Sequence, residues 1–231
     1  MGVILRRKYK LLLIIILSVI FAYLIYFFNK EDKIIISSFG DGVSSGETSY
    51  NIDGISYNDY IKEYYESRNI LKDYNKVYSK TNYKINELLN DIENNKYDET
   101  NDSYIEQIIH KSNIITLCFG EDELTKLSMT NDLKEDNIKL FLNNYDKVLD
   151  KMKRLTQAKI VVLGLYENEH LSKSNVIIIN SELANIVNKH KNIFINIADL
   201  MLNKEYFLNK NSYYFSYLGH ETISEIIIHS L

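Results

Sequence analysis

Residues 34–47, IIISSFGDGVSSGE, organise the rest of the chain. The stretch begins with three isoleucines, continues into a turn between Gly40 and Gly42, and ends in a polar loop. β-Branched apolar residues that run into glycines are typical of a strand whose carboxyl end carries a functional loop in an α/β sheet. We therefore expect a strand over residues 34–36 and a functional site at the turn that follows it.

An apolar segment precedes this stretch. Residues 11–28, LLLIIILSVIFAYLIYFF, contain no charged side chain, and four Lys and Arg lie before them. A bilayer core needs about 20 apolar residues, so the segment is just long enough to span it, and the positive-inside rule places the N-terminus in the cytoplasm. A cleaved signal peptide is the alternative, but YFFN at 26–29 offers no small-residue cleavage site. The predicted organisation is a cytoplasmic basic segment at 1–10, a transmembrane signal-anchor at 11–28, a linker at 29–33 and an extracytoplasmic domain at 34–231.

Composition and charge limit the classes of protein that fit. The 231 residues are 45% hydrophobic and 25% charged, as in globular proteins. Four of the 27 Lys and Arg lie before residue 11, which leaves 23 against 31 Asp and Glu, a net charge of −8. No dense basic cluster follows the apolar segment, so we expect no nucleic-acid partner. The single cysteine, Cys118, lies in an apolar run, which indicates a buried thiol.

Strand and helix patterns alternate along the domain. Continuous apolar runs are typical of strands that a parallel sheet buries on both faces, and we expect such strands at 114–119, 159–165 and 193–197, with a shorter one at 76–78. Helical spacing of apolar residues predicts helices at 56–74, 85–94, 103–111, 133–157, 175–190 and 218–230. This alternation predicts an α/β fold, a three-layer doubly wound parallel sheet.

Four blocks follow one another at the spacing of a known hydrolase family. They are Gly40-Asp41-Gly42, YSKTNY at 78–83, GEDE at 120–123 and a last block that ends in Gly219-His220. In this order they resemble the SGNH/GDSL hydrolases over roughly residues 33–231. The resemblance implies an SGNH-hydrolase-like, flavodoxin-like fold. It also implies acyl transfer in which the first block supplies a nucleophilic serine and an oxyanion N–H, the second an N–H, the third an Asn donor, and the last an Asp and a base His.

The residues that carry this chemistry in the family are replaced here. Gly42 stands at the serine position, and glycine has no atom that attacks. At the third block Asp122 replaces the Asn, and an ionised carboxylate accepts hydrogen bonds only and repels an oxyanion. In the last block Asn211 stands at the Asp position and Tyr214 at the His position, and tyrosine, with a pKa of about 10, is a poor base at neutral pH. Asn82 stands at the glycine position of the second block, where a backbone donor survives.

These replacements predict a catalytically inactive hydrolase-like domain, a membrane-anchored binding or assembly module of the cell envelope with no catalytic residue. Its ligand-binding cleft would be formed by Asp41, Gly42, Asn82, Glu121, Asp122 and Tyr214. The alternative is an active esterase or deacetylase of acylated envelope glycans or lipids that uses Ser44 or Ser45 with His220, although the matching family histidine opens the last helix and is usually structural. A purely structural role in envelope assembly is a third possibility.

No cofactor or metal is predicted. Acidic side chains at 41, 47 and 121–123 would gather at one sheet edge, as calcium and magnesium sites require, but they lack EF-hand-like spacing, and solvated acidic loops are the simpler interpretation. Zinc is not expected, because the five histidines show no H-x-x-x-H pattern and Cys118 is alone. The expected partners are the cytoplasmic membrane, through residues 11–28, and an envelope glycan or protein.

Overall fold

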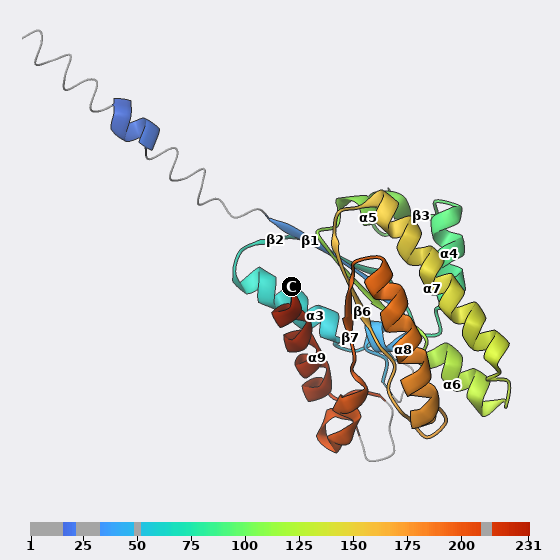
Figure 1. Ribbon diagram of the computed structural model, residues 1–231. Helices are drawn as coiled ribbons and strands as arrows, with labels where there is room; N and C mark the ends of the chain where they lie inside the picture. The colour runs from blue at the N-terminus through green and yellow to red at the C-terminus, as the bar shows by residue number, and fades with distance from the viewer. Residues whose placement is uncertain (1–15, 22–32, 49–51, 209–213) are drawn as a thin grey trace, which may run out of the picture. The chain divides into compact units, whose positions relative to one another are not determined.

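The computed structural model describes residues 16–21, 33–48, 52–208 and 214–231 (Figure 1). The chain divides into two compact units, Met1–Lys33 and Ile34–Leu231. In the first unit, the described residues 16–21 are helical. Most of the predicted signal-anchor, with the basic segment before it, lies outside the described residues. Within the described part of the chain, no helix is both long enough and apolar enough to cross a bilayer.

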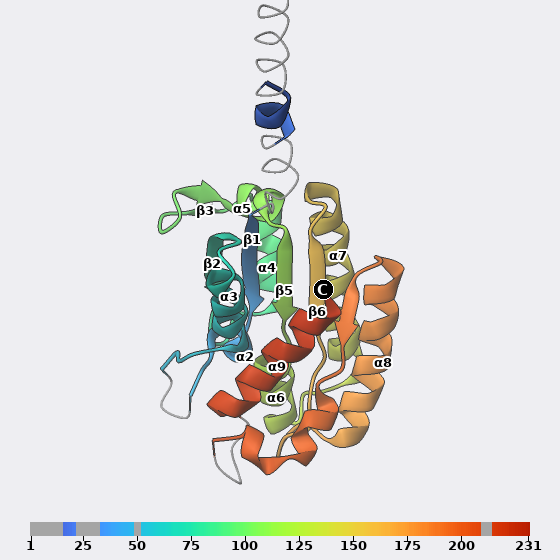
Figure 2. The same ribbon diagram turned by 90° about the vertical axis from the view of Figure 1, so that its left-hand side faces the viewer.

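A five-stranded parallel sheet forms the centre of the second unit (Figure 2). The strand order is β2-β1-β5-β6-β7. The chain leaves β1 for β2 on one side and later returns to β5 on the other side of β1, so the direction of winding changes at the β1–β5 pair. The carboxyl ends of the strands at such a switch point are where open α/β sheets bind ligands. The strands are β1 (Ile34–Gly40), β2 (Leu71–Ser79), β5 (Ile114–Cys118), β6 (Lys159–Leu163) and β7 (Ile193–Ile195).

Helices cover both faces of this sheet. One apolar core includes α3 and α9, which pack against each other, and the other includes α4, α5, α7 and α8. Successive strand residues point to opposite faces, so Ile115 and Leu117 enter one core while Ile114 and Cys118 enter the other. The predicted three-layer parallel architecture is therefore confirmed. The bounds are α3 (Tyr57–Ser67), α4 (Ile85–Glu93), α5 (Ile105–Lys111), α7 (Glu135–Leu155), α8 (Lys173–Lys189) and α9 (Tyr217–Ser230).

Some elements differ from the sequence-based expectation. The helix predicted over 56–74 ends at Ser67, because Asn69 adopts a left-handed backbone with φ of 58°, and β2 follows directly. The structure adds a helix, α6, after β5 and a short hairpin, β3–β4, whose second strand takes the first two residues of the helix predicted over 103–111. The remaining bounds are α2 (Gly42–Ser45), β3 (Tyr97–Asp98), β4 (Ser103–Tyr104), α6 (Glu121–Met129), η1 (Ala198–Leu202) and η2 (Lys204–Tyr206).

Candidate functional site

Asp41 ties the end of β1 to the end of β5. Its side chain is fully buried and caps α2 by accepting the N–H of Val43, 3.3 Å away. The same carboxylate accepts the N–H groups of Gly120, at 2.9 Å, and Asp122, at 3.4 Å. Burial, with the nearby carboxylates of Asp122 and Glu121, raises the pKa of Asp41 well above its usual value. Asp41 thus fixes the two loops in which the first and third blocks lie.

Two backbone donors converge on one carboxylate oxygen beside this turn. The N–H groups of Gly42 and Asn82 donate to Oδ2 of Asp122 over 3.0 and 2.8 Å. Donors preorganised in this way are what stabilises the oxyanion in acyl transfer. Here the protein's own carboxylate occupies that position. The structure therefore brings together the three residues at which the sequence placed the family's oxyanion donors.

Glu47 fills the space in which a side chain at position 42 would lie. A Cβ atom built on Gly42 would be 2.3 Å from Oε2 of Glu47 and 3.1 Å from Oδ2 of Asp122. Glu47 is buried, and burial together with the charge of Asp122 raises its pKa. Sequence reasoning considered Glu47 only as a member of an acidic cluster, because its distance from Gly42 depends on the turn that follows α2.

We expect Gly42→Ser to lower the free energy of unfolding by about 1–2 kcal/mol, since the new side chain overlaps the carboxylate of Glu47. In a Glu47→Ala background the same substitution should cost about 1 kcal/mol less. Urea denaturation of the wild type, both single variants and the double variant measures this coupling. An equal cost of Gly42→Ser in both backgrounds would contradict the overlap.

The candidate site encloses very little space. Its cavity has a volume of about 10 Å³, enough for about one water molecule. Four of the six predicted cleft residues line it, and the other two, Asp41 and Asn82, contact Asp122. Asn211 lies outside the described residues. The lining residues are Gly42, Val43, Glu47, Glu121, Asp122, Tyr166, Tyr214, Phe215 and His220.

Glu121 adds a further buried carboxyl group to the wall of the cavity. Its Oε1 accepts a hydrogen bond from Nδ2 of Asn168 over 2.5 Å, and its Oε2 has no hydrogen-bond partner among the described residues. Burial raises the pKa of Glu121 to about 8, and the charge of Asp122 acts in the same direction. Among the residues that the structure describes, no three His, Cys, Asp or Glu side chains are placed to hold a metal ion.

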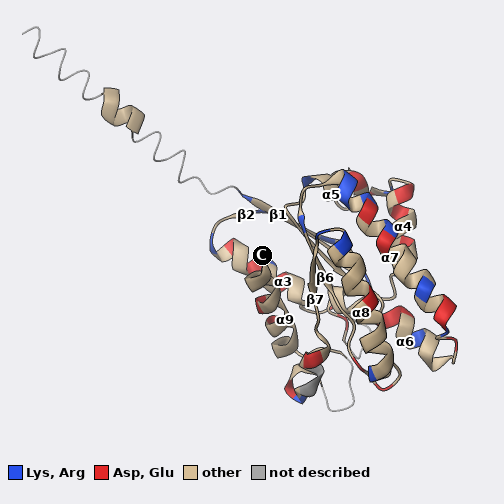
Figure 3. Cartoon of the chain, in the orientation of Figure 1, with Lys and Arg blue, Asp and Glu red and all other residues tan. Residues whose placement is uncertain are grey.

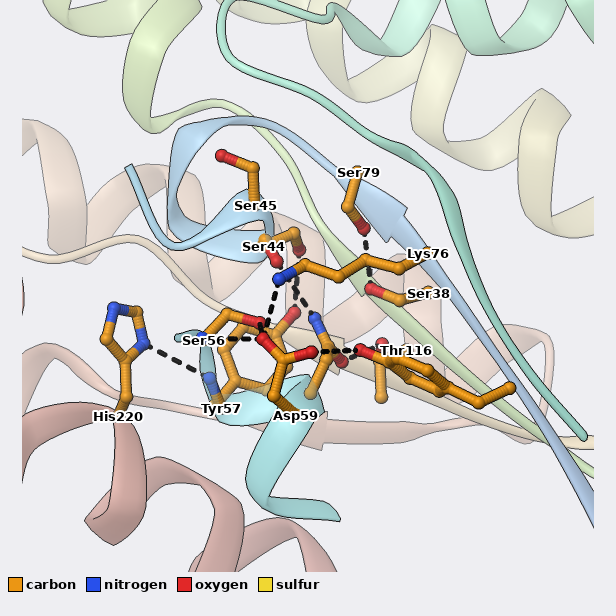
Figure 4. Close-up of polar contacts among 12 residues, drawn as sticks. Ser38, Ser44, Ser45, Ser56, Tyr57, Asp59, Lys76, Ser79, Thr116 and His220 are labelled. Atoms are coloured by element: carbon orange, nitrogen blue, oxygen red, sulfur yellow. Dashed lines mark hydrogen bonds and ion pairs between the residues drawn. The ribbon is translucent and has the colours of Figure 1, made fainter. Parts of the chain in front are cut away.

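The proposed substitute nucleophiles have other partners. The hydroxyl of Ser44 is hydrogen-bonded to that of Tyr57 over 2.7 Å, and the hydroxyl of Ser45 donates to the carbonyl of Gly42 over 3.1 Å. Nδ1 of His220 accepts the backbone N–H of Tyr57 over 3.2 Å, and burial lowers the pKa of His220 to about 3. In Figure 4 the dashed line from the imidazole ends at the backbone of Tyr57. Within the described residues, neither serine is hydrogen-bonded to His220.

A buried polar network holds the carbonyl of Ser44 in α2, and the sequence pattern does not indicate it (Figure 4). The side chain of Asn58 accepts from Thr116 over 2.7 Å and donates to the carbonyl of Ser44 over 3.2 Å. A separate, partly exposed ion pair lies beside it, in which Asp59 of α3 accepts from Nζ of Lys76 over 2.6 Å. Ser44, Asn58 and Thr116 lie on α2, α3 and β5. A polar residue in an amphipathic helix is usually exposed, so only the full burial of Asn58 reveals the network.

The fold is similar to those of solved esterases. No protein-family model and no curated protein matches the chain. The lipase/acylhydrolase from Enterococcus faecalis superposes with a TM-score of 0.64 at 14% identity, over 85% of this chain and 94% of that one.

A catalytic mutant of Axe2, an acetylxylan esterase from Geobacillus stearothermophilus, superposes with a TM-score of 0.65 at 12% identity, over 87% and 95% of the two chains. A putative GDSL-like lipase from Parabacteroides merdae gives 0.65 at 12% identity, over 87% and 97%. At these identities the likeness concerns the fold alone. The domain therefore has the SGNH/GDSL hydrolase-like fold that its four sequence blocks predicted.

Proposed function

We propose that this chain is a membrane-anchored, extracytoplasmic SGNH/GDSL hydrolase-like protein that is catalytically inactive and acts as a binding or assembly module of the cell envelope. The observation that carries the proposal is the Asp122 carboxylate, which accepts the N–H groups of both Gly42 and Asn82. An oxyanion formed next to this carboxylate would meet a like charge at about 4 Å, which costs about 4 kcal/mol at an effective dielectric constant of 20. That repulsion adds to the loss of both donors.

The positions of the nucleophile and of the base also support an inactive domain. Position 42 offers no attacking atom, and Glu47 occupies the space of the missing side chain. His220, with its lowered pKa and its Nδ1 engaged by Tyr57, is a weak candidate for a general base. These contacts favour an inactive domain over an esterase with relocated residues.

The envelope role rests on the predicted signal-anchor at 11–28 and on the class of similar structures. Two of those structures are a lipase/acylhydrolase and an acetylxylan esterase. A cavity of about 10 Å³ does not admit a sugar ring. We therefore propose that the partner, an envelope glycan or protein, contacts the rim of the closed site and does not enter it.

The test uses the full chain and a fluorophosphonate probe, together with simple acetyl esters. We expect no labelling and no hydrolysis, with a working SGNH esterase as the positive control. Probe attached to Ser44 or Ser45 and lost on mutation to Ala, or turnover that His220→Ala abolishes, would overturn the inactive assignment. Carbonate extraction and protease treatment of intact cells test the anchor separately, with the domain expected in the membrane fraction and cleaved from outside.

A further inference from the structure

A second, larger hollow lies at the other end of the sheet. It is a groove of about 920 Å³ where β1, β5 and β6 begin, whereas the candidate active site lies at their carboxyl ends. Apolar residues from several elements form part of its wall, among them Ile34, Ile70, Ile114, Leu155 and Ile228. We call this hollow the basal groove.

The charged side chains that line the basal groove all have one sign. Arg68, Lys111, Arg154 and Lys159 line it from four separate segments, and none of the lining residues that the structure describes is Asp or Glu. All four cations are exposed. In Figure 3, Lys and Arg are visible beside α5 and on the connection from α3 to β2. Residues 34–231 carry a net charge of −8, since the charges of residues 30–33 cancel. The cationic groove therefore has the opposite sign to the net charge of the domain.

Two of these cations are held in position. The guanidinium of Arg68 lies over the ring of Tyr64, 3.6 Å from its centroid. Arg154 pairs with Asp150, one turn earlier in α7, and that carboxylate is not part of the lining. Lys111 and Arg154, in the last turns of α5 and α7, also complement the helix dipoles, and Nζ of Lys159 donates to the main-chain oxygen of Leu231, which lines the groove as well. Neither contact accounts for the lack of acidic side chains in the lining.

We propose that the basal groove binds the phosphate-bearing headgroup of an anionic phospholipid. Arg and Lys side chains recognise phosphate oxygens, and the apolar wall suits the glycerol and the first acyl carbons. The sequence favours a lipid over a soluble anion, because Ile34 lines the groove and only residues 29–33 separate it from the apolar run at 11–28. Five residues reach at most about 18 Å. The inference rests on the membrane anchoring in the proposed function.

The experiment uses the full chain in nanodiscs of phosphatidylcholine, with or without phosphatidylglycerol that carries a photoreactive headgroup. Cross-links mapped by mass spectrometry are expected in residues 110–114 and 154–159. Lys111→Glu/Arg154→Glu should reduce them at least about tenfold, because each cation near an anionic surface contributes severalfold to binding. The matched control is Lys173→Glu/Lys204→Glu, which changes the same charge at exposed positions outside the groove and should leave the cross-links unchanged.

Each other outcome has a distinct meaning. Equal cross-linking in the groove variant and the control variant would overturn the basal groove as a lipid site while leaving the anchor intact. Full competition by soluble glycerol phosphate would make the ligand a free phosphate compound and overturn the lipid assignment. A chain that does not enter neutral nanodiscs would reject the anchor, and the lipid proposal with it, but would leave the inactive catalytic site unaffected.

Discussion

A chain that carries Gly42→Ser, Asp122→Asn, Asn211→Asp and Tyr214→His is expected to hydrolyse simple acetyl esters, whereas Gly42→Ser alone is expected to stay inactive. The fourfold change supplies each side chain that the resemblance assigns to the family's chemistry. Because the members of a triad act as a unit, variants that carry only some of these substitutions should hydrolyse acetyl esters little faster than the wild type. The complete set should raise the hydrolysis rate at least about a thousandfold over the wild type.

Gly42→Ser alone fails because the oxyanion donors stay occupied, since the N–H groups of Gly42 and Asn82 would still be held by Asp122. The new Cβ also overlaps the end of the Glu47 side chain, which has to shift in every variant that carries Gly42→Ser. An amide at position 122 supplies a donor in place of a negative charge, which is why Asp122→Asn belongs in the set. The measurement is acetyl-ester turnover together with fluorophosphonate labelling at residue 42. The matched control has Gly42→Ala in place of Gly42→Ser.

Turnover by Gly42→Ser alone would show that a base and an oxyanion hole already exist and that Tyr214 and Asp122 are wrongly aligned with the family's residues. If the fourfold variant folds but stays inactive, adding Glu47→Ala tests whether the overlap at position 42 is the remaining obstacle. Continued inactivity would mean that the catalytic positions have diverged beyond the four blocks.

The central strands were predictable because their apolar sequences reflect burial on both faces of the sheet. Each of β5 and β6 is a continuous apolar run, and both faces of these strands are covered by helices, so no polar alternation hides the pattern. Helix α6 was not predicted, since it begins with three acidic residues after Gly120 and resembles a polar loop. Acidic side chains in a first turn stabilise a helix by complementing its dipole, which apolar periodicity does not detect.

The sequence indicated which residues form the candidate site but not which of them contact one another. The sequence indicated that a carboxylate at Asp122 is unsuitable for an oxyanion hole, and the structure shows that it accepts both backbone donors. Gly42, Asn82 and Asp122 follow three different strands, so their distances depend on the sheet order, which the local sequence does not encode. The same is true of Tyr57, whose hydroxyl is hydrogen-bonded to Ser44 and whose N–H donates to His220.

The buried carboxyl group of Glu121 is expected to make the folded domain less stable as the pH rises from about 4.5 to about 8. Burial raises its pKa from 4.5 to about 8. Between these two values the unfolded chain has released the proton and the folded chain has kept it, so each rise in pH favours unfolding. The full effect is roughly 5 kcal/mol, present below the lower value and lost above the upper one. The raised pKa values of Asp41 and Glu47 act in the same direction.

His220 opposes this trend over part of the range, so the wild-type profile alone does not isolate Glu121. Its pKa falls from 6.5 to about 3 on burial, and the unfolded chain therefore binds the extra proton between these values. Stability from His220 rises with pH up to about 6.5 and is constant above it. The two residues offset each other below about pH 6.5, and the loss due to Glu121 should be visible between about pH 6.5 and 8.

The decisive comparison is therefore between the wild type and Glu121→Gln, which keeps an oxygen for the bond from Asn168 and removes the titration. Relative to the wild type, the variant should gain roughly 5 kcal/mol in the free energy of unfolding, measured by urea denaturation, between about pH 4.5 and pH 8. The matched control, Glu182→Gln, lies at an exposed position of α8 and should follow the wild type throughout. A parallel pH profile for Glu121→Gln and the wild type would mean that Glu121 is ionised in the folded state, and that the cluster at Gly42 holds one more negative charge than we infer.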